Sequence, residues 1–419
     1  MSFRFRSADL PVVVVARALS LLGDEVAALT LTLRLQSHGA GPGAVATLFI
    51  AALVPLVVLA PLTGRVVDSY DSRRLLLITG LVQAGLCVLL SAQTGTAAIL
   101  GLVLLLGVGQ AVNGATWQAL VPAIAGTERL ARAMGLTQAA ATVASVLSPA
   151  LAGLLYGRYG ARVPLLLDAA TFLLVAVAAL LVRTRHGLAR TTEATGEVNG
   201  TPATADQDRT ATTGLRFLRA DPLLRPLLVL LTVFMGLGSM INVVDVFLIR
   251  GTLHASATWY GIVGAAFAVG LLGGALAAGR VRDPQALPRV FITSAIVLAS
   301  GLAGMSLAGG VWTLLPVCLV VGLANGVLSV SVSTMVMGRA PEHVRGRVAA
   351  TVGGIASGAQ ITAYILGGTL GTVLTPREVF ALGGLLGLLA PLLLGRRVLR
   401  AAKVPGDRVP TGVAADCAA

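Results

Sequence analysis

Three ionisable side chains, Arg17, Asp24 and Glu25, lie within one long apolar stretch near the start of the chain. Arg17 and Asp24 are seven residues apart, so in a helix they share one face about two turns apart. An ionised side chain at the centre of a bilayer costs about 2.5–3.5 kcal/mol on insertion scales, so such residues are candidates for a function. We expect Asp24 or Glu25 to exchange a proton, with Arg17 beside them. The alternative is a static pair in which Arg17 and Asp24 only neutralise each other.

Two further acids lie within later apolar stretches. Asp245 is close to the outer end of its stretch, where it is either part of the proton-coupling site or part of a water-exposed rim. Asp168 is also near an outer end, and we expect it to make a structural pair with Arg158 or Arg162.

Neutral polar residues within the apolar stretches are candidates for binding a solute, because amide groups both donate and accept hydrogen bonds. Hydrogen bonds between helices explain the same residues equally well. The candidates for a substrate cavity are Asn113, Gln118, Gln138, Asn325 and Gln360.

The amino-acid composition limits the class of protein to which these residues belong. Hydrophobic residues make up 56% of the 419 residues and charged residues 12%, whereas soluble domains contain about 25% charged residues. The net charge of +13 comes from basic residues placed between apolar runs, which argues against a nucleic-acid-binding face. The only lysine is Lys403, so the Gly-rich ATP-binding loop that ends in Lys-Ser/Thr is absent and we expect no ATP site. The cysteines show no metal spacing, and we expect neither metal nor cofactor.

Twelve apolar stretches are long enough to cross a bilayer, for which about 20 residues suffice. They cover residues 10–34, 43–67, 75–94, 96–120, 133–157, 163–183, 224–249, 257–281, 290–309, 311–337, 347–373 and 378–397. The fold class predicted is therefore an all-α integral membrane protein with 12 transmembrane helices.

The distribution of arginine predicts the topology, because cytoplasmic loops retain an excess of Lys and Arg. With a cytoplasmic N-terminus, most basic residues fall on the cytoplasmic side, and the loops opposite hold only Arg34, Arg158, Arg162, Arg250 and Arg377. We therefore expect a multi-pass protein of the cell membrane with both termini in the cytoplasm.

A polar segment divides the chain into two halves. Residues 1–183 and 224–398 each hold six apolar stretches, and residues 399–419 form a cytoplasmic tail. Residues 184–223 between the halves begin as a segment rich in Thr, Ala and Gly, which predicts a flexible cytoplasmic linker. The linker ends in Leu, Phe and Arg residues that are typical of an amphipathic helix lying at the membrane surface.

The two halves also resemble each other. His38 recurs as His254 and Asn113-Gly114 as Asn325-Gly326, at similar offsets along the chain. Gly64-Arg65-Val66-Val67-Asp68 likewise recurs as Gly279-Arg280-Val281-Arg282-Asp283. Two six-helix repeats predict a transporter in which a site near the membrane midplane, between the repeats, is opened to either side in turn.

The loop after the second stretch reads Gly64-Arg65-Val66-Val67-Asp68-Ser69-Tyr70-Asp71-Ser72-Arg73-Arg74. It resembles the signature loop of the major facilitator superfamily, in which a Gly, an Asp and basic residues form a cytoplasmic gate. Gly64, Asp68, Arg73 and Arg74 match that pattern, while Ser69 and Asp71 depart from it. The resemblance implies that these four residues form a conformational gate; otherwise the loop is a solvated polar turn that fixes topology.

A second segment, Ser148-Pro149-Ala150-Leu151-Ala152-Gly153, resembles the Gly-Pro-x-x-Gly-Gly segment of antiporters in this superfamily, with Pro149 and Gly153 matching. Ordinary packing of membrane helices explains it nearly as well. Weaker matches at residues 17–24, 120–122, 168–172 and 345–348 are similar to the branch that holds enterobactin-type siderophore exporters and macrolide or multidrug efflux proteins.

These observations predict a secondary transporter, not an enzyme. We expect proton-coupled efflux of a small amphipathic or cationic organic compound, such as a drug, a secondary metabolite or a siderophore, by alternating access. The partners expected are this substrate and the lipid bilayer, with no nucleic acid and no ATP, and the transporter is expected to be a monomer that uses the proton gradient. Proton-coupled uptake of a nutrient and a non-transporting receptor or scaffold with the same fold remain alternatives.

Overall fold

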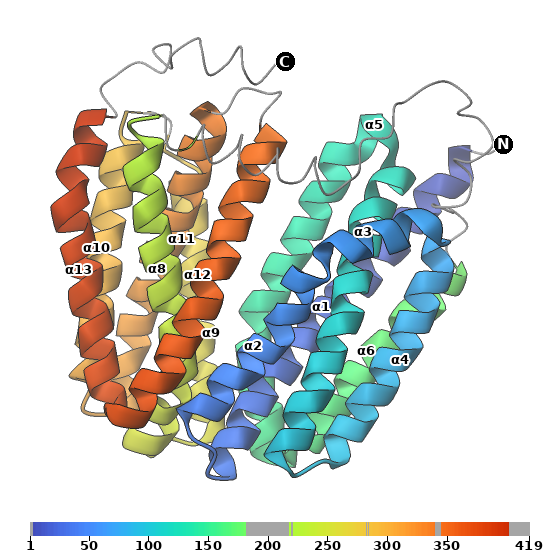
Figure 1. The fold of residues 1–419 in the computed structure, drawn as a ribbon, viewed down its shortest axis with the longest axis horizontal. Coiled ribbons are helices and arrows are strands. Elements are labelled where there is room, and N and C mark those ends of the chain that lie inside the picture. The colour runs from blue at the N-terminus through green and yellow to red at the C-terminus, as the bar shows by residue number, and fades with distance from the viewer. Residues whose placement is uncertain are drawn as a thin grey trace. The chain divides into compact units, whose positions relative to one another are not determined.

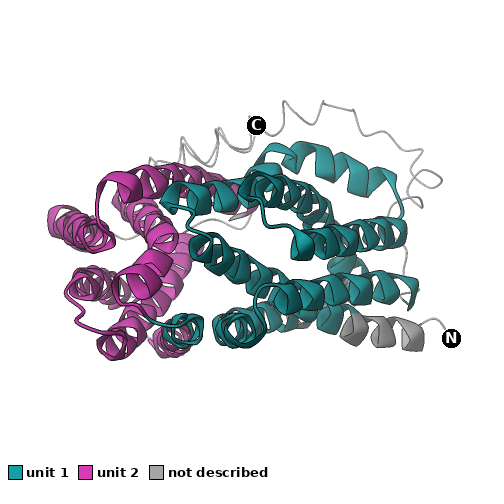
Figure 2. Ribbon diagram, turned by 90° about the horizontal axis from the view of Figure 1, so that it is seen from below, with its two compact units in different colours: residues 1–198, 255–265 teal, residues 199–254, 266–419 magenta. Residues whose placement is uncertain are grey.

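A computed structural model of the protein describes residues 3–181, 218, 221–281, 283, 285–339 and 345–401, and every regular element within these ranges is a helix (Figure 1). The helices group into two compact units, coloured separately in Figure 2. Unit 1 comprises residues 1–198 and 255–265, and unit 2 comprises residues 199–254 and 266–419.

Unit 1 is built from the first half of the sequence. Its helices are α1 (Phe3–Ser37), α2 (Pro42–Val58), α3 (Ala60–Ser69), α4 (Ser72–Ala92), α5 (Thr96–Tyr159) and α6 (Arg162–Leu181). Unit 2 contains α8 (Leu224–Val246), its π-helical continuation η2 (Phe247–Thr252), α10 (Leu287–Ser306), α11 (Val311–Arg339), α12 (Arg345–Val373) and α13 (Pro376–Ala401). Helix α9 (Ala257–Ala278) begins in unit 1 and ends in unit 2.

The predicted apolar stretches correspond to helices. Within the described part of the chain, ten helical spans are long and apolar enough to cross a membrane, and α2 with α3 forms one further span that is bent by 56°. Helix α1 covers the remaining predicted stretch and carries the charged residues Arg17, Asp24 and Glu25. Large apolar side chains such as Leu181 and Leu393 point outward, 62% and 72% exposed, as expected of helices that face lipid.

The fourth and fifth predicted stretches differ from expectation, because they join into the single 64-residue helix α5. The connection at residues 121–132 was expected to be a loop. It contains Pro122 and Gly126, but seven of its 12 residues are Ala, Arg, Leu or Glu, which favour helix, and the helix continues through it. Pro122 and Pro149 lie inside α5.

Small residues bring helices together in both units. In unit 1, a Cβ on Gly80 of α4 would lie 2.9 Å from the carbonyl oxygen of Phe172 on α6. In unit 2, Gly270 and Gly274 of α9 lie against the backbone of α11, and Gly322 and Gly326 of α11 lie against the backbone of α9. These two Gly-x-x-x-Gly pairs let the backbones approach as in other membrane helix pairs.

Arginines near the helix ends donate hydrogen bonds to backbone carbonyl groups. Arg34 Nη1 donates to the carbonyl oxygen of Leu90 at 3.1 Å, and Arg377 Nη2 donates to that of Ala308 at 2.9 Å. Leu90 lies in the last turn of α4, where carbonyl groups have no partner within the helix and carry partial negative charge, so the guanidinium of Arg34 is stabilising there. Ala308 lies just beyond the end of α10.

The predicted linker and tail lie largely outside the described residues. The described end of the linker is buried: Leu218, Asp221 and Leu223 are each at most 3% exposed. Asp221 accepts hydrogen bonds from the backbone N–H groups of Leu223 and Leu224 at 2.7 and 3.1 Å, at the start of α8. It also pairs with Arg339 of α11 at 3.1 Å. The division of the chain at residues 184–223 stays a prediction.

Candidate functional site

The charged residues of α1 lie in the interior of unit 1. Arg17, Asp24 and Glu25 are all half-buried. Glu25 Oε2 accepts a hydrogen bond of 2.7 Å from the Ser148 hydroxyl on α5. Ser148 belongs to the antiporter-like segment, so the structure links that segment directly to an acid of the predicted coupling site.

Asp24 interacts with Arg17 electrostatically and accepts a hydrogen bond from the Gln110 side chain on α5. The guanidinium of Arg17 is not fully satisfied, since its Nη1 is buried without a hydrogen-bond partner. Proton exchange at Asp24 and the static pair of Arg17 with Asp24 both stay predictions.

Asp168 is not where the sequence interpretation placed its partners. It is 2% exposed, and its Oδ2 accepts a hydrogen bond of 3.3 Å from Cys87 Sγ on α4. Arg162 is exposed, and the Arg158 guanidinium lies 5.9 Å from the centre of the Tyr159 ring. The expected pair with Arg158 or Arg162 is wrong, because Asp168 faces α1 and α4 in the interior of unit 1.

Asn113 is fully buried in unit 1 and donates a hydrogen bond of 3.3 Å to Gln83 Oε1 on α4. Here hydrogen bonding between helices describes the residue better than direct contact with a solute. Gln118 and Gln138, two other cavity candidates, are exposed on α5.

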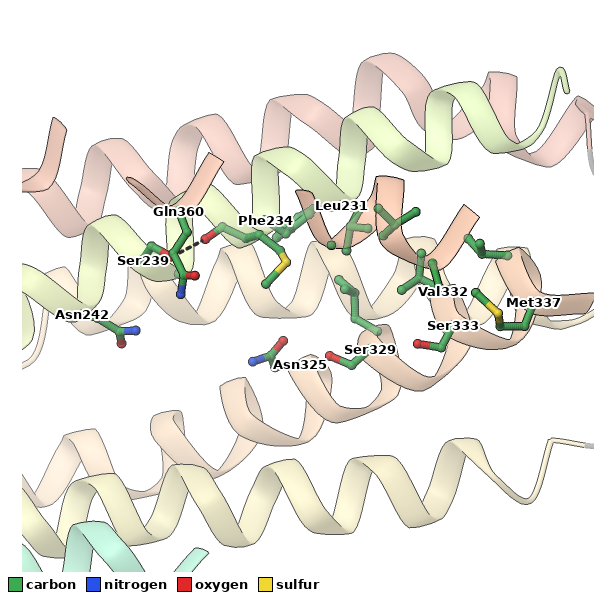
Figure 3. Close-up of a pocket in the computed structure, with 17 residues that line it drawn as sticks. Leu231, Phe234, Ser239, Asn242, Asn325, Ser329, Val332, Ser333, Met337 and Gln360 are labelled. Atoms are coloured by element: carbon green, nitrogen blue, oxygen red, sulfur yellow. Dashed lines mark hydrogen bonds between the residues drawn. The ribbon is translucent and has the colours of Figure 1, made fainter. Parts of the chain in front are cut away.

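Unit 2 contains a cavity of about 580 Å³ between α8, α11 and α12 (Figure 3). Its size is within the range of about 300–1,000 Å³ for small-molecule sites. Figure 3 shows Asn325, Ser329 and Ser333 on one face of α11, with Phe234 and Asn242 on α8 and Gln360 on α12. Residues four apart share a helix face, which is why the three α11 side chains all line the cavity.

Two of the predicted cavity residues, Asn325 and Gln360, line this cavity. Gln360 also donates a hydrogen bond of 3.2 Å to the Tyr364 hydroxyl, one turn further along α12. The serines at 329 and 333 were missed from the sequence, although their spacing of four from Asn325 was a readable signal. The full described lining is neutral: it consists of apolar, amide and hydroxyl side chains.

Asp245 lies one turn after Asn242 near the end of α8 and is half-buried. It interacts electrostatically with the buried Cys318 of α11, and it is not among the residues that line the cavity. A role for Asp245 in coupling stays a prediction.

The gate residues lie on α3 and at the start of α4. Asp68 and Arg74 are exposed, and no atom of another element lies within 4 Å of a Cβ built on Gly64. Arg73 has a defined role inside unit 1, because its Nε and Nη2 donate to the carbonyl oxygens of Ala179 and Leu180 at 2.9 and 2.7 Å. In the structure, therefore, Arg73 holds the end of α6, and the gate itself stays a prediction.

Asp71, which replaces a Gly of the superfamily pattern, begins α4. Its Oδ1 accepts a hydrogen bond of 2.9 Å from the backbone N–H of Arg73. Asp is a favoured residue at the N-cap position of a helix. This departure from the pattern therefore has a local structural reason.

The antiporter-like segment forms a close contact between helices. A Cβ on Gly153 would lie 2.6 Å from Gly261 Cα and 2.7 Å from the Ala257 carbonyl oxygen, both on α9. A Cβ on Gly264 would meet the ring of Pro149. The segment thus packs α5 against the first turns of α9, within unit 1.

No group of three or more His, Cys, Asp or Glu is placed to hold a metal ion in the part of the chain that the structure describes.

The sequence profile of a family described as "transmembrane secretion effector" matches residues 4–410, nearly the whole chain. The chain belongs to this family. It is a multi-pass membrane transporter of the major facilitator superfamily and not an enzyme. No curated protein sequence matches this chain.

Solved structures share the fold of this transporter. A bacterial homologue of the iron transporter ferroportin, solved in an inward-facing state, superposes with a TM-score of 0.70 at 14% identity, over 96% of this chain and 100% of the other. A transporter of the POT family in complex with 5-aminolevulinic acid gives 0.70 at 11% identity, over 94% and 96%. The nucleoside transporter NupG gives 0.66 at 12% identity, over 95% and 100%. At these identities the likeness concerns the fold alone.

Proposed function

We propose that the protein exports small amphipathic or cationic organic compounds across the cell membrane in exchange for protons, by alternating access. The observation that carries the proposal is that the two units hold different kinds of side chain. Unit 1 holds Asp24 and Glu25 beside Arg17 on one helix, whereas unit 2 holds a neutral cavity large enough for an organic molecule.

Carboxylates within the membrane suit proton coupling. Each can bind a proton and become neutral, which removes the cost of an unpaired charge in an apolar environment. One elementary charge that crosses 100 mV releases about 2.3 kcal/mol, and a pH gradient adds to this. Transport against a concentration gradient then requires no ATP.

The cavity supports an amphipathic substrate. Phe234, Met235 and Met337 offer apolar and adaptable surface, and Asn325 and Gln360 offer hydrogen bonds. Methionine side chains repack around different shapes and are common at promiscuous binding surfaces. Because the described lining is neutral, a neutral amphipathic compound fits it better than a cation does.

Two observations support export over import. The family is described by the word secretion, and the antiporter-like segment around Pro149 and Gly153 is joined to Glu25 through the hydrogen bond of Ser148. The direction of transport is measured in the following experiment.

The test uses inverted membrane vesicles, in which export appears as accumulation of a labelled amphipathic compound. We expect accumulation to stop after addition of an uncoupler and in Asp24→Asn with Glu25→Gln. The matched control is Glu378→Gln, the same change at an exposed acid that bonds to Thr375. Accumulation that persists unchanged after the uncoupler and in the double variant would refute proton coupling through these acids.

The gate is a separate part of the proposal. We propose that Asp68, with Arg74, makes contacts in only one access state, which lets a small site bias the conformational equilibrium. Cysteine accessibility from each side of the membrane should shift in Asp68→Asn. An unchanged distribution of accessibility rejects this role.

A further inference from the structure

Asp168 is a buried acid that the proposed function does not use. It lies on α6, is 2% exposed, and faces two other helices. Cys87 Sγ on α4 donates to its Oδ2 at 3.3 Å. On α1, a Cβ at Gly23 would lie 2.5 Å from Asp168 Oδ1, so any larger residue at position 23 would require the acid to move.

The donors around the Asp168 carboxyl group are weak, since one is a thiol and the other is a hydroxyl shared with a backbone carbonyl oxygen. The Thr171 hydroxyl lies 2.8 Å from the Asp168 carbonyl oxygen and 3.3 Å from Asp168 Oδ1. A hydroxyl has one hydrogen, so when it donates to the nearer carbonyl oxygen it offers Oδ1 only a lone pair. A protonated carboxyl group can then donate from Oδ1 to Thr171 while Oδ2 accepts from Cys87.

The charged groups near Asp168 also favour the protonated form of this acid. The titratable groups that act on Asp168 are Asp24 on α1, next to the Gly23 that lies against Asp168, and Cys87 on α4. The same two helices also carry Arg17, Glu25 and Arg34 on α1 and Arg73 and Arg74 at the start of α4. Arg17 interacts with Asp24, and a negative charge on Asp24 opposes one on Asp168. Two carboxylates that share one site with a single cation do not both stay ionised when they are removed from water.

We propose that Asp168 is a proton-binding site, which holds a proton while Asp24 is ionised beside Arg17, with Cys87 as the positioning donor. Asp168 and Asp24 then form one proton-binding centre across α6 and α1. The role of this centre in transport rests on the proposed function, but the presence of a proton on Asp168 does not. The two are therefore tested by different measurements.

Infrared spectroscopy of the full-length protein in lipid nanodiscs tests the proton directly. We expect the C=O band of a protonated carboxyl group at neutral pH, and we expect Asp168→Asn to remove it. Cys87→Ala should shift the band because a hydrogen bond to the carboxyl is lost, whereas Cys318→Ala, at a buried cysteine of unit 2, should not. A band that is unchanged in both Asp168→Asn and Cys87→Ala overturns the assignment.

Transport tests what the proton does. An asparagine at 168 keeps the shape of the acid but cannot release a proton. We therefore expect loss of accumulation driven by a pH gradient, while exchange of labelled for unlabelled substrate continues. Accumulation that is retained in Asp168→Asn overturns a role of Asp168 in coupling. The role is also overturned if accumulation and exchange are lost equally in both Asp168→Asn and Thr171→Val. If the wild-type protein ignores an uncoupler, the proposed function fails, and the infrared result still decides whether Asp168 holds a proton.

Discussion

Replacing Gly153 by alanine tests the close contact of α5 and α9. The new Cβ would lie 2.6 Å from Gly261 Cα, 2.7 Å from the Ala257 carbonyl oxygen and 2.8 Å from the Gly261 nitrogen. All three are backbone atoms, so no side chain can rotate away, and the helices must separate until the contact reaches at least 3.4 Å.

The size of the effect follows from two opposing terms. Overpacking a tight contact costs about 1–3 kcal/mol, and replacing glycine by alanine inside a helix gains about 1 kcal/mol. Gly135 is the matched control, because it lies on the same helix and no atom of another element lies within 4 Å of its Cβ position. Gly135→Ala has the gain in helix propensity without the overpacking cost. The free energies of unfolding of the two variants should therefore differ by about 1–3 kcal/mol.

Thermal unfolding of the two purified variants in the same detergent measures this difference. We expect Gly153→Ala to unfold at a lower temperature than Gly135→Ala and to transport more slowly. A Gly153→Ala protein that is as stable as Gly135→Ala would refute the close packing of α5 on α9, and with it the structural basis given for the antiporter-like segment.

Three further predictions concern other parts of the two units. Arg339→Ala leaves the buried carboxylate of Asp221 without the cation paired with it and should lower the free energy of unfolding by about 3 kcal/mol. Asp221→Asn keeps the side-chain oxygen that caps α8 and should lower the free energy of unfolding by less. A lower unfolding temperature for Asp221→Asn than for Arg339→Ala would contradict this. Arg73→Ala removes two hydrogen bonds to the end of α6 and should cost about 1–2 kcal/mol by the same measurement, whereas an unchanged unfolding temperature would show that they contribute nothing. Asn325→Leu should weaken binding of an amphipathic substrate about tenfold, measured by equilibrium binding, while the exposed Thr334→Val should not; equal effects would exclude the cavity as the binding site.

The helices were predictable because apolar runs of about 20 residues leave few alternatives in a membrane protein. The continuity of α5 was not, since the polar residues between its halves are also good helix formers. The Gly-x-x-x-Gly pairs of α9 and α11, at Gly270 and Gly322 among others, were visible in the sequence, but their register against each other required coordinates.

The candidate site was predictable only in part. Charged residues within an apolar run drew attention to Arg17, Asp24 and Glu25, and the structure places all three in unit 1. The surroundings of Asp168 were mispredicted, because sequence proximity suggested Arg158 or Arg162, which shortly precede it in the chain. The true contacts at Cys87 and Gly23 come from helices that are distant in sequence.

Flux in reconstituted vesicles tests the central claim most directly. The purified protein is inserted into liposomes, a pH gradient is imposed, and movement of a labelled amphipathic compound is followed with the gradient in each direction. Proton exchange predicts that the compound accumulates on the side with more protons, and that reversing the pH gradient reverses the accumulation. A flux that ignores the sign of the pH gradient would contradict the account.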